Sequence, residues 1–261
     1  MVQPKLSDLV RIAKNAGKIL LEGFGTDIHV DHKGLVDLVT DMDRRSEDYI
    51  LNEIRTMFPG DEIVAEESGV LEGKNTARWI VDPLDGTVNY AHRLPIYSVS
   101  IAYAIGNEVQ LGVVYNPAMD ECFTAERGKG AWLNGKPIQV ANAEKLVDAL
   151  LVTGFPYDIR TTEFNNMDEF NALVMKSQGM RRLGSAALDC CYVADGRLDG
   201  YWEYGVKIWD VAAGGLIAEE AGVVVTDVYG GADYLKSPLS ICCANESVHK
   251  EMLDVLRETR K

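Results

Sequence analysis

The stretch that decides the fold is WIVDPLDGTVNY, residues 79–90. It opens with apolar residues typical of a buried strand, and two aspartates, Asp82 and Asp85, follow at the end of that strand. Pro83 between them has a fixed φ and favours an extended conformation for Asp82. Asp85 belongs to an Asp-Gly turn signal and also suits the N-cap of a helix that starts at Thr87. We therefore expect a strand, an acidic turn and a short helix, with the proline holding the two carboxylates apart.

The charges of this turn favour cations. Its carboxylates would repel a phosphate ester, whereas the N–H groups of Gly86 and Thr87 at the start of the short helix would attract one. Divalent ions between carboxylates and phosphate remove this conflict, and hard oxygen ligands suit magnesium or manganese better than zinc. By itself, the D-P-x-D pattern is better explained as a plain turn with a capping aspartate. The metal interpretation therefore depends on the rest of the chain.

The composition is that of an acidic globular protein. The chain has 261 residues, 47% of them hydrophobic, which suits one large domain or two closely packed halves. Its 26 basic and 40 acidic residues give a net charge of −14. Because nucleic acids and anionic membranes are also negatively charged, we expect the protein by itself to bind neither.

The five cysteines form neither a secretory disulfide pattern nor a zinc site; they are Cys122, Cys190, Cys191, Cys242 and Cys243. We expect buried, reduced thiols, which are typical of the cytoplasm. The first residues lack the features of a signal peptide, and no apolar run is long enough to span a bilayer. A cytoplasmic location is therefore expected.

Hydrophobic periodicity predicts helices and strands in alternating blocks, without an internal repeat. Helices are expected over residues 6–20, 44–58, 163–177, 186–195, 209–221 and 246–260. Strands are expected over residues 62–65, 78–81, 197–204, 223–227 and 239–244, with several more between 97 and 126. Such alternation indicates a mixed α and β fold built of stacked layers.

Two other segments carry acids at the ends of elements. VAEESG, residues 64–69, places Glu66 and Glu67 after a strand-like run. KIWDVAAGG, residues 207–215, places Asp210 at the start of a helix, followed by small residues that permit close packing. Taken singly, each acid also fits a solvated side chain or a helix cap.

Together these segments resemble the inositol monophosphatase family of magnesium-dependent, lithium-sensitive phosphatases. The family motif W-x-[IV]-D-P-x-D-G-T-x-N-[FY] is matched by residues 79–90, and W-D-x-[AS]-[AG]-G by residues 209–214. The G-E-E-S element appears at residues 65–68 with alanine in place of glycine, and VDLVTDMD (36–43) and RRLGSAALD (181–189) are also similar. The resemblance implies a layered α-β-α-β-α sandwich of the inositol monophosphatase/fructose-1,6-bisphosphatase type. It implies one domain over residues 1–261, made of two packed αβ halves with a boundary near 145–155.

The resemblance also implies the metal ligands. Glu66, Asp82 and the main-chain carbonyl of Leu84 would hold a first magnesium ion, and Asp82, Asp85 and Asp210 would hold a second. Glu66 would share a weaker third ion, and manganese is expected to be able to substitute for magnesium.

Catalytic and phosphate-binding residues follow from the same resemblance. Thr87 and Asp43 would orient the attacking water and help to deprotonate it, and Glu66 completes the expected catalytic group. A threonine hydroxyl is too weak a base to act alone, so Asp43 must accept its proton or hold it in place. The main-chain N–H groups of Gly86 and Thr87 would contact the phosphate.

The substrate is expected to touch small and acidic residues. Glu203 would accept hydrogen bonds from hydroxyl groups, although it also fits a strand residue that faces solvent. The full set of expected substrate contacts is Asp85, Gly86, Thr87, Gly184, Ser185, Ala186, Glu203 and Asp210.

Other positions leave alternatives open. Lys33 would cover the site from a loop, and Glu67 fits a residue behind the ligands at least as well as a ligand. The turn-rich segment 153–164 could shape specificity. Three arginines, Arg160, Arg181 and Arg182, fit either a grip on a second phosphate or ordinary surface charges.

The function implied by the resemblance is magnesium-dependent hydrolysis of inositol 1-phosphate and related sugar or polyol phosphates by metal-activated water. A fructose-1,6-bisphosphatase or dual-specificity phosphatase of the same family is the alternative. A non-catalytic regulatory or interaction protein is a third hypothesis, from a different class. The expected partners are a small phosphate ester and a second copy of the chain in a homodimer.

Overall fold

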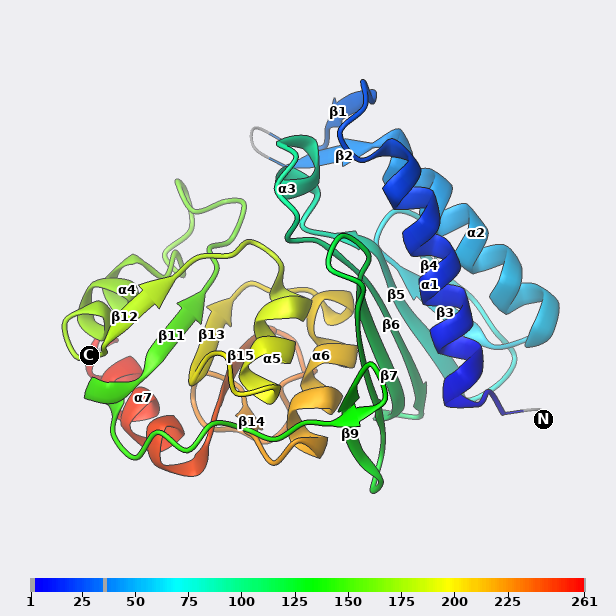
Figure 1. Cartoon of the computed structure of the whole chain (residues 1–261). Coiled ribbons are helices and arrows are strands. Elements are labelled where there is room, and N and C mark those ends of the chain that lie inside the picture. Colours follow the sequence, from blue (N-terminus) through cyan, green and yellow to red (C-terminus); the bar gives the residue numbers. More distant parts are fainter. Residues whose placement is uncertain (1–2, 35–36, 261) are drawn as a thin grey trace.

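The computed structural model describes residues 3–34 and 37–260. Helices and sheets alternate in five layers, which confirms the layered α-β-α-β-α sandwich expected from the resemblance (Figure 1). The first residue of the family-like segment 36–43 lies outside the described residues.

The first layer consists of α1 (Leu6–Gly23) and α2 (Asp41–Met57), whose apolar faces pack on an eight-stranded sheet. The strands of this sheet lie in the order β10-β9-β8-β7-β6-β5-β3-β4. Their bounds are β3 (Glu62–Ala65), β4 (Gly69–Leu71), β5 (Ala77–Asp85), β6 (Ser98–Ile105), β7 (Glu108–Asn116), β8 (Glu121–Glu126), β9 (Gly130–Leu133) and β10 (Lys136–Pro137). Strands β1 (Val30–His32) and β2 (Leu38–Thr40) form a separate antiparallel pair.

The middle layer consists of α5 (Ala186–Ala194) and α6 (Ile208–Glu220). Small residues let these helices approach each other and the first sheet closely. A Cβ atom on Gly112 of β7 would lie 3.0 Å from the main-chain oxygen of Ala213. A Cβ atom on Gly214 would lie 2.8 Å from Cβ of Cys190. The close packing expected after Asp210 is therefore present.

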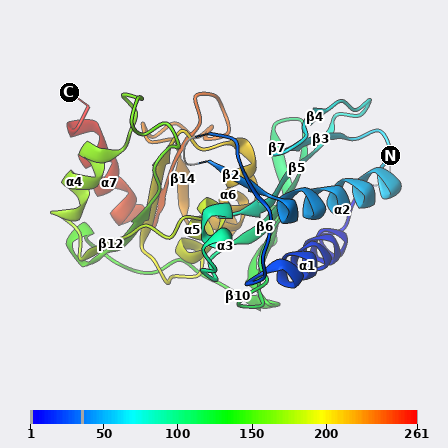
Figure 2. The ribbon, with the colours of Figure 1, turned by 90° about the horizontal axis from the view of Figure 1, so that it is seen from above.

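The second sheet has five strands in the order β12-β11-β13-β15-β14. Their bounds are β11 (Leu150–Thr153), β12 (Gly179–Arg181), β13 (Gly200–Tyr204), β14 (Val224–Thr226) and β15 (Ser240–Ala244), and a 3₁₀ turn over Leu146–Asp148 precedes them. Helices α4 (Met167–Val174) and α7 (Glu246–Glu258) pack on the outer side. The view from above shows α1 and α2 at one end of the molecule and α4 and α7 at the other (Figure 2).

A β-bulge in β5 positions the acidic turn. Asp82 pairs with Ser100 of β6 and Asp85 pairs with Ser98, so three steps along β5 face two steps along β6. In a regular strand, residues three apart point to opposite faces of the sheet. The extra residue brings both carboxylates to the same face, and Pro83 suits the bulge because it has no N–H group to pair.

Two details of the expected elements are wrong. Asp85 is not the N-cap of the following short helix, α3 (Thr87–Ala91), because β5 continues to Asp85 and the N-cap is Gly86 with φ 97°. The helix expected over residues 163–177 forms only as α4. It begins late because Asn166, buried and left-handed (φ 67°), donates a 2.7 Å hydrogen bond to the carbonyl of Gly154.

Two further expectations concern the state of the cysteines and the presence of membrane-spanning helices. Cys122, Cys190, Cys191, Cys242 and Cys243 are all free and buried, as expected. Among the residues that the structure describes, no helix combines the length and the apolar character needed to cross a membrane.

Candidate active site

The acidic ends of several elements meet at one cavity of about 260 Å³. It lies where the ends of β3 and β5 approach the starts of α5 and α6 and one end of β13. Most of the residues expected from the sequence line it: Lys33, Glu66, Asp82, Leu84, Asp85, Gly86, Thr87, Gly184, Ser185, Ala186, Glu203 and Asp210. Asp43, Glu67 and Arg181 are not among its lining residues.

Strand pairing brings Glu66 and Asp82 together. Strands β3 and β5 are parallel neighbours, with Ala65 opposite Val81. The main-chain N–H of Glu66 donates to the carbonyl of Val81 at 3.2 Å, which continues the pairing one residue further. Because the ends of parallel strands lie at the same edge of a sheet, Glu66 emerges beside Asp82.

Asp85 connects the first sheet to the middle layer. Its Oδ2 atom accepts hydrogen bonds from the main-chain N–H of Ala187 at 3.0 Å and from the hydroxyl groups of Ser98 and Ser185. Ala187 lies in the first turn of α5, where unpaired N–H groups attract negative charge. Asp85 therefore caps a helix that begins about a hundred residues later in the chain.

Asp82 and Asp210 are held in a similar way. Asp82 Oδ1 accepts the main-chain N–H of Leu84 at 3.0 Å, and Asp210 Oδ2 accepts that of Lys207 at 2.6 Å. In Asp82, Asp85 and Asp210 alike, these bonds use one carboxylate oxygen. The other oxygen of each side chain is left for a ligand in the cavity.

The carboxylates of the cavity destabilise one another. Burial, followed by the charges of Glu66, Asp85 and Asp210, raises the pKa of Asp82 well above its usual value. Burial also raises the pKa of Asp210 well above that value, the pKa of Glu66 to about 7 and the pKa of Asp85 to about 6. A bound divalent cation would offset this repulsion.

The acidic side chains are not positioned as a complete ion-binding site. Within residues 3–34 and 37–260, no three histidine, cysteine or acidic side chains converge closely enough to hold an ion. The ammonium group of Lys33 instead lies against Glu66 at 2.9 Å and against Glu67 at 2.5 Å. The donor set is chemically suited to a divalent ion, but in this structure a lysine supplies the neighbouring positive charge.

Thr87 and Asp43 form the pair expected from the sequence. The Thr87 hydroxyl lies 3.0 Å from Asp43 Oδ1 and 3.0 Å from the carbonyl oxygen of Leu84, so it can donate to either. Asp43 Oδ2 accepts the N–H of Thr40 at 2.8 Å and its hydroxyl at 2.5 Å, which fixes the carboxyl group. Burial raises the pKa of Asp43 to about 6.

Glu67 takes part in a network behind the cavity. Its main-chain N–H donates to Glu47 at 2.9 Å, and the hydroxyl of Ser68 donates to the other oxygen of Glu47. Because its carboxylate contacts Lys33 and does not line the cavity, this arrangement favours the supporting role over ligation.

The far end of the cavity combines Glu203 with small residues. The hydroxyl of Tyr201 donates to Glu203 Oε2 at 2.7 Å, and burial raises the pKa of Glu203 to about 7. Gly184 has φ 87°, and a Cβ atom there would come within 2.8 Å of Arg182 Nη1. The absence of a side chain at this position leaves room beside Arg182.

Of the three arginines left open by the sequence, the structure brings only Arg182 to the cavity. Arg181 is exposed on β12 and donates to the carbonyl of Met180 at 2.9 Å, and Arg160 is also exposed. Arg182 follows directly after the end of β12, and of these two neighbours only Arg182 lines the cavity.

Asp189 and Tyr157 are among the lining residues that the sequence prediction did not single out. Asp189 lies in the family-like segment 181–189. It follows Ser185, the N-cap residue of α5, by four residues and therefore lies on the same face of that helix. Tyr157 reaches the cavity from the segment 153–164, although it remains half exposed. Helical spacing could have identified Asp189, whereas no spacing relates Tyr157 to the acids.

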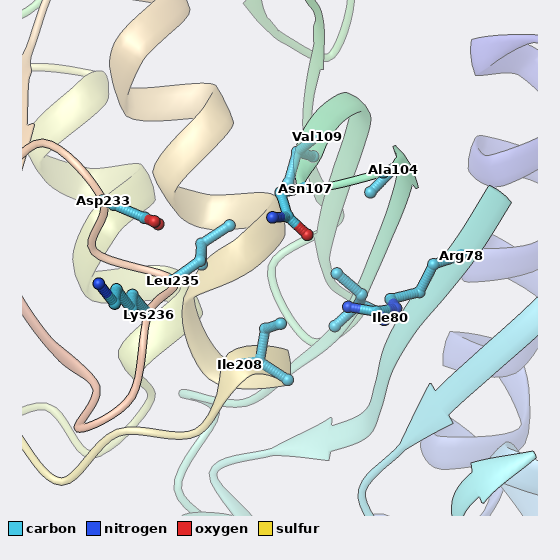
Figure 3. A pocket seen from close by; sticks show the side chains of 10 residues that line it. Arg78, Ile80, Ala104, Asn107, Val109, Ile208, Asp233, Leu235 and Lys236 are labelled. Carbon is cyan, nitrogen blue, oxygen red and sulfur yellow. The ribbon is translucent and has the colours of Figure 1, made fainter. Parts of the chain in front are cut away.

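A second cavity is larger, about 450 Å³, but lacks the acidic set (Figure 3). Arg78 and Ile80 of β5, Asn107, and Ile208 at the start of α6 lie around it, together with the segment that carries Asp233 and Lys236. The charged residues that line it are Arg78, Asp233 and Lys236. We therefore place the chemistry in the smaller cavity.

Comparison with known proteins agrees with the fold. The sequence profile described as "Inositol monophosphatase family" matches residues 2–261. The chain is 43% identical over 256 residues to "Inositol-1-monophosphatase" of Mesorhizobium japonicum, covering 97% of this chain and 96% of that protein. It is 42% identical over 259 residues to "Nus factor SuhB" of Pasteurella multocida, covering 98% and 97%. The crystal structure of the extragenic suppressor protein suhB from Bartonella henselae superimposes with a TM-score of 0.91 at 38% identity, covering 97% and 98%.

Proposed function

Because this chain belongs to the inositol monophosphatase family, we propose that it is a magnesium-dependent phosphomonoesterase acting on inositol 1-phosphate and related polyol phosphates. The observation that carries the proposal is the meeting of Glu66, Asp82, Asp85 and Asp210 at one cavity. Buried like charges cost stability, so a protein gains from such a cluster only if it binds cations there.

The residues fit magnesium, with manganese as a substitute. Glu66, Asp82 and the carbonyl of Leu84 would hold one ion, and Asp82, Asp85 and Asp210 a second, with Glu66 sharing a weaker third. The unused oxygens of the three aspartates support this assignment. When bound, such ions lower the pKa of a coordinated water and neutralise charge on the phosphate.

Thr87 and Asp43 position the attacking water. The Thr87 hydroxyl donates its proton to Asp43 or to the carbonyl of Leu84, which turns its lone pairs toward the cavity. There it accepts a hydrogen bond from the water and orients it toward phosphorus. Asp43, held by both the N–H and the hydroxyl of Thr40, accepts the proton that passes through this pair.

The rest of the cavity suits a hydroxylated alcohol. Glu203 can accept hydrogen bonds from hydroxyl groups, and the small residues Gly184 and Ala186 allow a ring to approach the wall closely. Phosphate release should be measured with magnesium on inositol 1-phosphate, fructose 1,6-bisphosphate, NADP and 3′-phosphoadenosine phosphate. We expect the highest kcat/KM on inositol 1-phosphate. Inactivity on the whole panel would overturn the proposal.

The same panel tests the alternative within the family. Arg182 at the cavity gives a specific reason to keep a bisphosphate in view, because a guanidinium binds a phosphate with two parallel hydrogen bonds. A higher kcat/KM on fructose 1,6-bisphosphate than on inositol 1-phosphate would favour the fructose-1,6-bisphosphatase or dual-specificity function.

A second candidate function is a regulatory role like that named for the relatives. Several proteins about as similar as the phosphatase relative carry the name Nus factor SuhB, among them that of Pasteurella multocida at 42% identity. Such a role does not require turnover. It would be favoured if the purified protein released no phosphate from any ester of the panel while replacing the relative's Nus factor in vivo.

A further inference from the structure

Asp189 is a buried carboxyl group in the wall of the cavity with an unused hydrogen-bonding atom. The residue is 1% exposed, and its Oδ1 atom has no hydrogen-bond partner among the described residues. Within residues 3–34 and 37–260 it forms no ion pair, although the charge of Arg182 acts on it. Leaving such an atom unpaired in a buried position is costly, so a ligand or water is needed to satisfy it.

The surroundings of Asp189 indicate what kind of ligand. Asp189, Glu203 and Asp85 line the same cavity, and the charges of Glu203 and Asp85 act on Asp189. Burial and these charges raise the pKa of Asp189 well above its usual value. Three neighbouring carboxyl groups disfavour an anion at this position, and they favour neutral groups that donate hydrogen bonds.

We propose that Asp189 is a specificity-determining residue that binds a hydroxyl group of the alcohol part of the substrate, beside Glu203. The inference rests on the proposed phosphatase function. Asp85 marks the phosphate end of the cavity, and Glu203 marks the alcohol end. Asp189 follows Ser185, which donates to Asp85, by one turn of α5, and it lines the same cavity as Glu203.

A matched pair of esters tests this role. Cyclohexyl phosphate has the ring and the phosphate ester of inositol 1-phosphate but none of its free hydroxyls. Asp189→Leu, which removes the polar atoms at similar volume, should lower kcat/KM on inositol 1-phosphate about tenfold, the worth of one hydrogen bond to a buried group. The same variant should leave kcat/KM on cyclohexyl phosphate within about twofold.

The melting temperature distinguishes a residue that binds the substrate hydroxyl from one that only stabilises the fold. Because Asp189 has an unpartnered buried oxygen, Asp189→Leu should melt at the same temperature as the wild type or higher. Asp189→Asn keeps one acceptor oxygen and should lose less selectivity than Asp189→Leu. Tyr192→Phe, on the same helix but outside the cavity, is the control and should leave the ratio of kcat/KM on the two esters unchanged.

Each outcome decides between the proposals. An equal loss of kcat/KM on both esters, or no loss on either ester, would overturn the role of Asp189. A fall in melting temperature together with equal losses would show a structural residue instead. If the wild type released phosphate from neither ester, the proposed function would fail and this inference with it, whereas an active wild type with an unchanged ratio would overturn the inference alone.

Discussion

Asp85 Oδ2 accepts the main-chain N–H of Ala187 at 3.0 Å, so a carboxylate at the end of β5 caps helix α5 of the next layer. The same side chain offers its other oxygen to the cavity. One residue thus joins the first sheet to the middle layer of helices and contributes to the proposed metal site.

These two roles of Asp85 can be separated by substitution. Asp85→Asn keeps an oxygen for Ala187 but loses the charge needed by a metal ligand. We expect the rate of phosphate release to fall by at least about 100-fold, because even residues behind a ligand cost up to that much. Circular dichroism should show an unchanged fold.

Asp85→Ala is the matched control for this pair of roles. It leaves the N–H of Ala187 without its acceptor and should lower the free energy of unfolding by about 1–2 kcal/mol, measured by denaturant titration. Turnover like that of the wild type in Asp85→Asn would rule out the metal assignment.

The Thr87–Asp43 pair predicts a loss in kcat rather than in substrate binding. Thr87→Val keeps the shape of the side chain but removes the hydroxyl that orients water. Its kcat should fall about 100-fold, in the range typical of lost acid–base catalysis, with KM little changed. Thr87→Ser restores the hydroxyl and should recover most of the rate; a valine variant as fast as the serine variant would contradict the role.

The raised pKa values predict how the stability of the metal-free protein depends on pH. Asp43 and Asp85 titrate at about 6 and Glu66 at about 7 in the folded chain, above their values of about 4 in the unfolded chain. A raised pKa stabilises the folded state at low pH, and that contribution is lost as the pH rises toward 7. With EDTA present, the melting temperature should be higher at pH 5.5 than at pH 8.

Asp43→Asn provides the control for the pH profile. The amide does not titrate, so the decline in melting temperature between pH 5.5 and pH 8 should be shallower than in the wild type. A melting temperature that rises with pH in EDTA would show that these acids are not destabilised by their burial.

Removal of metal should reversibly abolish activity. We expect EDTA to stop phosphate release and magnesium to restore it, while magnesium raises the melting temperature more at pH 8, where the acids are ionised, than at pH 5.5. Lithium should inhibit at high magnesium, an expectation that rests on family membership. Full activity after exhaustive chelation would remove the basis for metal catalysis.

Much of the site could be predicted from sequence because its residues stand in short motifs. Asp82 and Asp85 belong to one segment, and Asp210 follows the start of a helix whose small residues are visible in the sequence. Local patterns also identified Thr40–Asp43 as part of a family-like segment. They misplaced Asp85 as a helix N-cap, because an Asp-Gly pair before a helix signals a cap whether or not the strand continues.

Long-range contacts could not be predicted in this way. Asn166 delays the start of α4 through bonds to Gly154 and Trp202, which no local pattern announces. Arg181 and Arg182 are equivalent in the sequence, and only the direction of the backbone decides which one reaches the cavity.

The sequence by itself determined the types of residue, their order and the elements that carry them, because periodicity and turn chemistry act over a few neighbouring positions. Only the tertiary structure decided that Asp82 and Asp85 share a face, that Asp85 caps α5, and that Oδ1 of Asp189 is buried without a hydrogen-bond partner among the described residues. Those relations depend on a bulge against a neighbouring strand and on contacts between segments about a hundred residues apart. The packing of layers creates such contacts, and no spacing along the chain records them.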